Sequence, residues 1–178
     1  VESVTWFDVI RFCNALSLRE KLSPAYEIDV DDESEIRWSK ASNGYRLLTE
    51  AEWEFAARAN RKHAFSGGDD PELVGWFQEN SEEHSKPVGQ KEPNVWGLFD
   101  MSGNVWEWVF DASKRAYQKA TTNPVHLIMK KRSYHVRRGG GINGKKREAR
   151  VSNRSKQRSV TKSKTTGFRC VRLQPKDS

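Results

Sequence analysis

Cysteine is scarce in this chain, which has only Cys13 and Cys170 among its 178 residues. Two cysteines cannot supply the disulfide framework of a small secreted domain, and we expect both to be small buried thiols. Long apolar runs are also lacking, and none could span a bilayer as a helix. No signal-peptide pattern follows Val1. The opening residues are typical of the interior of a domain, so we expect an N-terminal part to precede them.

Aromatic residues and apolar periodicity are both absent between Ile142 and Thr166. This segment consists mostly of Lys, Arg, Ser, Thr, Gly, Asn and Gln, and fixed-looking motifs frame it: Arg137-Arg138-Gly139-Gly140-Gly141 before it and Gly167-Phe168-Arg169 after it. A segment with no apolar face adds little to a core, so we expect exposed loops or strand edges on one face of the molecule. The contrast with the Trp-rich remainder favours a surface that displays side chains over a catalytic site.

Acidic residues are rare at the same end of the chain. From Lys130 to Ser178 there are 17 Lys and Arg residues against 2 acids, a net charge of +15, whereas the remainder carries −8 and the whole chain +7. Such asymmetry is typical of a contact with nucleic acid or another acidic surface, but also of an ordinary solvated surface. On charge alone, the solvated surface is the favoured interpretation. The segment offers no aromatic residue to stack a base, so no nucleic-acid partner is expected.

The seven Trp and eight Phe residues are enough for the core of one domain, and we assign residues 1–178 to a single unit. Apolar spacing predicts a helix over residues 8–18. Thr49 and Glu52 form a capping box that predicts a second helix, ending near Asn60. This helix is expected to bury Trp53, Phe55, Ala56 and Ala57. Residues 65–99 are rich in turn residues, and their expected anchors are Trp76, Trp96, Trp106 and Trp108.

The sharpest local motif is the stretch Gly97 to Trp108. It places the carboxylates of Asp100 and Glu107 around a Gly-Asn turn. Carboxylates and intervening main-chain carbonyls can supply the oxygen ligands that calcium requires. The same residues can equally cap a turn and satisfy buried amides, and the motif alone leaves both readings open.

Several motifs together resemble the sulfatase-modifying-factor family, whose best-known member is the formylglycine-generating enzyme. In family order from Val4 to Arg172, they are Gly44 to Arg58, Pro87-Val88-Gly89, Asn94 to Trp108, Arg138-Gly139-Gly140 and Gly167-Phe168-Arg169. The resemblance implies an α+β, C-type lectin-like fold with few short strands, two main helices and much irregular loop. It also implies a structural calcium ion, with the side chains of Asp100 and Glu107 and the carbonyls of Gly103 and Val105 as ligands.

The chain departs from the enzyme where that family carries two active-site cysteines. Counted from Gly140, these positions hold Gly144 and Ala149, and neither side chain can become a thiolate or bind copper. Related sulfoxide synthases bind iron through histidines. The four histidines here have no ligand spacing, and we expect each to be exposed in a loop: His63, His84, His126 and His135. We therefore expect no copper, no iron and no oxidase activity.

A second branch of this fold, the variable proteins of diversity-generating retroelements, including treponemal ones, resembles this chain more closely. In that branch adenine-directed mutagenesis rewrites the segment between Arg-Gly-Gly and Gly-Phe-Arg, here residues 138–169. Many residues of this segment can derive from Asn or Lys codons by changes at adenine, although an ordinary basic loop of an AT-rich genome has the same composition. The expected variable, ligand-binding residues are Ile142, Asn143, Gly144, Lys145, Arg147, Glu148, Ser155, Lys156, Gln157, Arg158, Val160, Thr161, Lys162 and Lys164.

This second resemblance implies a monomeric, non-enzymatic ligand-binding protein of receptor or adhesin type, anchored by lipid at the cell surface through the preceding segment. Its ligand would be a protein or other macromolecule with an anionic or polar surface. Residues 150–154 are expected to hold the variable patches in place, with Arg150 and Arg154 paired to acidic scaffold residues. The alternatives are an oxidoreductase of the sulfatase-modifying type and a nucleic-acid binder that uses the basic end.

Overall fold

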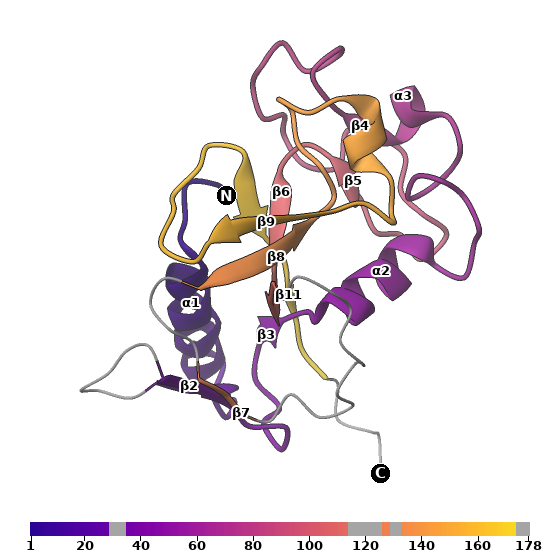
Figure 1. Ribbon diagram of the computed structural model, residues 1–178. Helices are drawn as coiled ribbons and strands as arrows, with labels where there is room; N and C mark the ends of the chain where they lie inside the picture. The colour runs from indigo at the N-terminus through magenta and orange to yellow at the C-terminus, as the bar shows by residue number, and fades with distance from the viewer. Residues whose placement is uncertain (29–34, 114–125, 129–132, 174–178) are drawn as a thin grey trace.

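The computed structural model describes residues 1–28, 35–113, 126–128 and 133–173. It has the expected mixed α and β architecture with much irregular loop, but more strands than the sequence predicted (Figure 1). The helices are α1 (Trp6–Arg19), α2 (Glu50–Arg58), α3 (Pro71–Val74) and the 3-10 helix η1 (Lys146–Ala149). The strands are β1 (Tyr26–Ile28), β2 (Glu35–Trp38), β3 (Arg46–Leu47), β4 (Gly75–Trp76), β5 (Ser102–Gly103), β6 (Trp106–Ala112), β7 (His126–Ile128), β8 (Tyr134–Arg138), β9 (Arg154–Arg158), β10 (Thr166–Phe168) and β11 (Cys170–Val171).

Both predicted helices form, and capping boxes start them. Thr5 accepts a hydrogen bond from the amide of Asp8, and the Asp8 carboxylate accepts one from the Thr5 amide. Thr49 and Glu52 make the same reciprocal pair at the start of α2, as the sequence predicted. Each box satisfies amides that lack a partner in the first helical turn.

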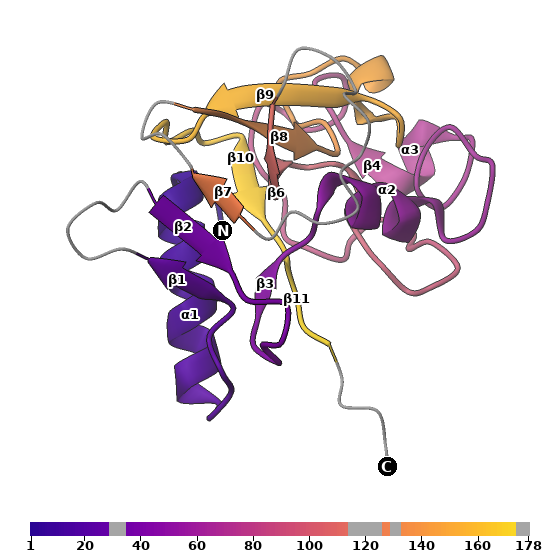
Figure 2. The same ribbon diagram turned by 60° about the horizontal axis from the view of Figure 1, so that its bottom comes forward.

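The main sheet has four strands in the order β10-β6-β8-β9. The central strand β6 pairs in parallel with β10 and antiparallel with β8, and β8 pairs antiparallel with β9. The strand β9 therefore lies at one edge of this sheet. Helices α1 and α2 lie on opposite sides of β6 and β3 in both views (Figures 1 and 2). Smaller sheets join β1-β2-β7, β11-β3 and β4-β5.

Tryptophans form much of the core, and the indole N–H groups of Trp6 and Trp108 donate to backbone carbonyls. Trp6 and Trp108 are fully buried and donate to the carbonyls of Val109 and Val4, at 2.9 and 3.1 Å. Trp108 and Trp106 are thus anchors, as predicted. The prediction was wrong for Trp96 and Phe55, which are 47% and 64% exposed. Their rings pack edge to face on each other, 5.1 Å apart, on the outer side of α2.

The two cysteines lie side by side, although they are 157 positions apart. The Sγ atoms of Cys13, in α1, and Cys170, in β11, are 3.5 Å apart. Cys13 is buried as expected, whereas Cys170 is half-buried. The hydrogen bond between the thiols raises the pKa of Cys13 and lowers that of Cys170. The pair joins the first helix to the last strand.

His135 is not the exposed loop residue that the sequence predicted. It lies in β8, where its side chain is fully buried and stacks on Trp6, with ring centroids 3.9 Å apart. Its Nδ1 lies 3.2 Å from the carbonyl of Phe110. Burial lowers the pKa of His135 to about 3, so the ring is neutral at neutral pH. A neutral imidazole can serve as an aromatic core residue here because a backbone carbonyl accepts its N–H.

We predict that His135 makes the protein acid-sensitive. The unfolded chain binds a proton at this ring below about pH 6.5, whereas the folded chain does not until pH falls to about 3. The contribution of His135 to stability is thus complete above pH 6.5 and falls by about 1.4 kcal/mol per pH unit below it. Urea unfolding between pH 7.5 and pH 5 should show this loss in the wild type. His135→Phe should lack it, and the exposed control His63→Gln should retain it. Equal pH dependence in the wild type and His135→Phe would contradict the prediction.

Candidate functional site

The segment predicted to vary leaves the sheet after β8 through two glycines whose conformation excludes other residues. Gly139 and Gly140 have φ values of +94° and +77°, and a Cβ at Gly140 would lie 2.8 Å from the Cα of Ala149. The chain then forms η1, returns as the edge strand β9 and passes through a loop into β10. The two glycines therefore allow a tight turn, and η1 packs directly against this turn.

Most of the predicted variable residues reach solvent. Two are buried: Ile142 is 4% exposed, and Gly144 also lies inside. The amide of Ile142 donates to the carbonyl of Asn104, and its carbonyl accepts a hydrogen bond from Ser81. Assigning Ile142 and Gly144 to the displayed set was therefore wrong. The exposed residues are Asn143, Lys145, Arg147, Lys156, Arg158, Val160, Lys162 and Lys164, and the half-exposed ones are Glu148, Ser155, Gln157 and Thr161.

The displayed residues share one side of the molecule but not one face of the sheet. Figure 2 shows β9 and η1 along the same upper side. Within β9, successive side chains alternate between faces. Lys156 and Arg158 lie over the ring of Tyr134, with their cationic groups 5.3 and 5.8 Å from its centroid. Ser155 and Gln157 turn to the other face, toward Arg137. The displayed residues therefore lie on one side of the molecule, as expected, but their side chains project from both faces of the sheet.

Arg137 was not among the predicted site residues, yet variable side chains converge on it. Its guanidinium lies over the ring of Trp106, 4.8 Å from the centroid. It donates to Ser155 at 3.4 Å, to Thr166 at 2.9 Å and to Gln157. Burial lowers the pKa of Arg137, and the nearby charge of Glu148 acts against this shift. The sequence did hold a signal for Arg137. Adjacent residues of a strand face opposite ways, so Arg137 and Arg138 could not both face the same partner.

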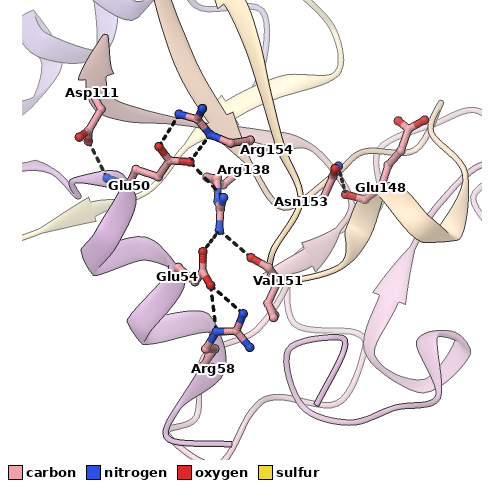
Figure 3. Close-up of polar contacts among 9 residues, drawn as sticks. All are labelled: Glu50, Glu54, Arg58, Asp111, Arg138, Glu148, Val151, Asn153 and Arg154. Atoms are coloured by element: carbon pink, nitrogen blue, oxygen red, sulfur yellow. Dashed lines mark hydrogen bonds and ion pairs between the residues drawn. The ribbon is translucent and has the colours of Figure 1, made fainter. Parts of the chain in front are cut away.

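The neighbouring Arg138 faces α2 and is fully buried in an ion-pair network (Figure 3). It donates to Glu50 at 3.0 Å, to the carbonyl of Val151 at 2.6 Å and to Glu54. Arg154, at the start of β9, binds both carboxylate oxygens of Glu50, at 2.8 and 2.7 Å. The predicted pairing of Arg154 with an acidic scaffold residue is thus confirmed. The network ties α2, β8 and β9 together.

The carboxylate of Glu54 is held in its charged form. Burial raises the pKa of Glu54, but the hydrogen bond from Arg58 and the charge of Arg138 outweigh it, so the net shift is downward. Glu50 begins α2, where the helix dipole favours a negative charge. Its amide donates to Asp111 at 2.6 Å. Burial, with the charges of Glu50 and Glu52, raises the pKa of Asp111.

The turn between η1 and β9 is held by the buried Val151 and the half-buried Asn153. Val151 is 1% exposed and its amide donates to the carbonyl of Ala64, while Asn153 donates to the carbonyl of Glu148 at 2.8 Å. These two residues fix the backbone between the displayed patches, as the sequence predicted. Arg150 differs: it is exposed, and its Nε donates to the carbonyl of Arg147 at 3.1 Å rather than to an acid.

We predict that Arg138 stabilises the fold far more than Arg154. Arg138→Ala leaves the carboxylates of Glu50 and Glu54 without their buried partner, which should cost about 3–5 kcal/mol of unfolding free energy. Arg154→Ala removes a half-exposed partner, while Arg138 still neutralises Glu50, so its cost should be about 1 kcal/mol. Urea unfolding at pH 7.5 measures both. Equal costs would show that the buried contact does not dominate.

Two of the residues proposed as calcium ligands, Glu107 and Asp100, accept hydrogen bonds from protein groups in this structure. Glu107 is buried, and its two oxygens accept hydrogen bonds from Arg169 at 2.6 and 2.7 Å and from the Trp53 indole at 2.6 Å. Burial lowers the pKa of Arg169, but the charges of Glu107 and Asp100 raise it on balance. One Asp100 oxygen accepts from the amide of Gly89. The Arg169 guanidinium thus neutralises Glu107, whereas the second Asp100 oxygen is buried without a hydrogen-bond partner among the described residues. Calcium binding with the carbonyls of Gly103 and Val105 stays a prediction.

From this geometry we predict that calcium leaves the stability of the protein unchanged. The sequence instead predicts a structural calcium ion, whose removal would lower the stability. The melting temperature should be the same with EGTA, with magnesium and with millimolar calcium, because Arg169 already neutralises Glu107. Binding of an ion to the folded state alone raises stability in proportion to the logarithm of its concentration. A melting temperature that rises with calcium and not with magnesium would restore the calcium site.

Comparisons with known proteins agree with this geometry. The family described as the Sulfatase-modifying factor enzyme 1-like domain matches residues 1–174, and the chain belongs to this family. The solved structure of Treponema denticola variable protein 1 superposes with a TM-score of 0.85 at 28% identity, over 96% of this chain and 69% of that one. The fold is therefore the C-type lectin-like fold of the formylglycine-generating enzyme type.

Curated relatives differ in their described roles. A protein named Chaperone protein LppX from Paenibacillus barcinonensis is 38% identical over 62% of this chain and 51% of its own length. The formylglycine-generating enzyme of Streptomyces coelicolor is 33% identical over 76% of this chain and 48% of its own. The Inactive C-alpha-formylglycine-generating enzyme 2 of Bos taurus is 30% identical over 86% and 52%. The chain thus spans about half the length of these relatives.

Proposed function

We propose that the protein is a non-enzymatic, ligand-binding variable protein whose binding surface is formed by η1, β9 and the adjoining loops. The observation that carries this proposal is that exposed side chains project from a framework held by a buried ion pair. Asn143, Lys145, Lys156 and Arg158 are exposed, whereas Arg138 beneath them is fully buried and paired. Side chains that point into solvent from a rigid framework can change without loss of the fold.

The similarity to Treponema denticola variable protein 1 supports diversification of this surface. The positions rich in residues reachable from Asn or Lys codons coincide largely with exposed or half-exposed side chains. We infer that a retroelement rewrites these codons while Arg138, Val151 and Asn153 keep the backbone in place. The surface would then present a different set of side chains in each variant of the protein.

The ligand that suits the present surface is a macromolecule with anionic or polar groups. Its exposed residues include six Lys and Arg side chains: Lys145, Arg147, Lys156, Arg158, Lys162 and Lys164. Exposed cations of this density favour association with acidic surfaces. We propose a monomer displayed at the cell surface and anchored by lipid. None of the helices that the structure describes could span a bilayer.

An oxidoreductase of the family's enzymatic type is the alternative function. Its chemistry needs a thiolate, and the two positions that would supply it are Gly144 and Ala149. Both are buried, Gly144 just before η1 and Ala149 at its end, and a Cβ at Gly144 would lie 2.7 Å from a Glu148 carboxylate oxygen. Turnover of a cysteine-containing sulfatase peptide, with copper and oxygen supplied, would establish this alternative in place of ours.

We predict that the displayed residues can be replaced together with little loss of stability. A library varying Asn143, Lys145, Lys156 and Arg158 should change the unfolding free energy by about 0.5 kcal/mol or less per position, because these side chains lie in solvent. Trp108→Ala should cost about 3–5 kcal/mol, because it opens a core cavity. Thermal melting compares the two sets, and selection of the library against an acidic protein tests whether binding follows the displayed residues. Library members that unfold as readily as Trp108→Ala would refute the proposal.

A further inference from the structure

Arg137 carries a charge that the described part of the protein does not neutralise. Arg138 next to it has Glu50 and Glu54, whereas no described carboxylate lies within ion-pair distance of Arg137. Its Nη1 donates to the Gln157 amide oxygen and to Thr166. Its Nε makes only a long contact of 3.4 Å with Ser155, and its Nη2 has no hydrogen bond to the described residues. The edge of the guanidinium formed by Nε and Nη2 therefore has few hydrogen bonds within the described protein. Such an edge on a half-buried guanidinium is suited to binding an external anion.

We propose that Arg137, stacked on Trp106, is a fixed carboxylate-binding subsite for an Asp or Glu side chain of a protein ligand. This inference rests on the proposed function and names the chemistry of one contact within it. The Nε and Nη2 atoms form a planar edge that matches both oxygens of a carboxylate. Stacking on the Trp106 ring, 4.8 Å from its centroid, holds the guanidinium plane in place before binding.

The subsite is built on the sheet, not on the variable loops. Arg137 lies in β8, Trp106 in the central strand β6, and Thr166 at the start of β10. Thr166 is fully buried, and Trp106 is 4% exposed. A ligand acid would therefore meet the same cation in every variant of the surface. One constant charged contact gives diversified surfaces a shared preference for acidic proteins, while the displayed residues select among them.

Variable residues surround this constant cation and can adjust its strength. The Glu148 carboxylate acts on Arg137 through its charge without touching it. Gln157 occupies Nη1 through its amide oxygen, and a Glu at that position would place a carboxylate against the guanidinium. Such an internal carboxylate would neutralise Arg137 and compete with the acid of a ligand. The diversified positions can thus weaken or strengthen the subsite without altering Arg137.

The test uses hexaglutamate as the probe and hexaglutamine as its uncharged control. Two-dimensional NMR of the 15N-labelled protein reports the Arg137 Nε–H and Trp106 indole N–H signals. Both signals should shift saturably with hexaglutamate and not with hexaglutamine. Glu148→Gln should tighten the apparent Kd about twofold or more, and Gln157→Glu should weaken it about fivefold or more.

Arg137→Gln and Lys164→Gln separate a specific subsite from general attraction to a basic surface. Each removes one positive charge, but Lys164 is exposed and lies outside the subsite. Arg137→Gln should weaken the apparent Kd about fivefold or more, and Lys164→Gln about twofold or less. If Arg137→Gln does not fold, Gln157→Glu, which retains Arg137, carries the comparison.

Two results would overturn the subsite. One is a hexaglutamate effect confined to the signals of Lys145, Lys156 and Lys164, with the Arg137 and Trp106 signals unmoved. The other is equal weakening by Gln157→Glu and Lys164→Gln. The proposed function would survive either result if replacement of Lys145, Lys156 and Arg158 still changed which protein ligands bind. Failure of the subsite is therefore distinguishable from failure of the binding surface itself.

Discussion

The surface formed by η1, β9 and the adjoining loops depends on the contacts of one buried group, the guanidinium of Arg138. It lies between Glu50 and Glu54 of α2 and the carbonyl of Val151, so one side chain joins a helix, the central part of a sheet and the turn that leads into β9. A charge in this position is stable only with its partners in place. The same constraint that makes the network costly to break makes the backbone of the displayed segment well defined.

Charge is divided between two adjacent residues of β8 with opposite consequences. Arg138 faces α2 and is neutralised within the protein, whereas Arg137 faces Trp106 and, among the described residues, hydrogen-bonds only to neutral groups. The alternation of a strand produces this division without any change in residue type. A structural cation and a cation suited to a ligand can therefore occupy neighbouring positions, and the scaffold and the proposed binding surface meet at this strand.

Local chemistry made part of this structure predictable. The capping box at Thr49 depends on residues close in sequence, and it formed as expected. Long-range pairing was not predictable in the same way. His135 is buried because β8 packs beside Trp6, and Glu107 is neutralised by Arg169, 62 positions away. The sequence shows these charges and rings, but not which of them meet across the sheet.

We propose that a fixed framework carries a segment that is rewritten at the level of its codons. Deep sequencing of the encoding gene across one population of cells tests it most directly. The account predicts substitutions confined to adenines of a template, concentrated at exposed positions such as Asn143, Lys156 and Arg158, with Arg138 and Val151 unchanged. A nearby near-copy of the segment and a reverse transcriptase gene should accompany them. A single invariant sequence, or substitutions spread evenly over framework and surface, would contradict the account.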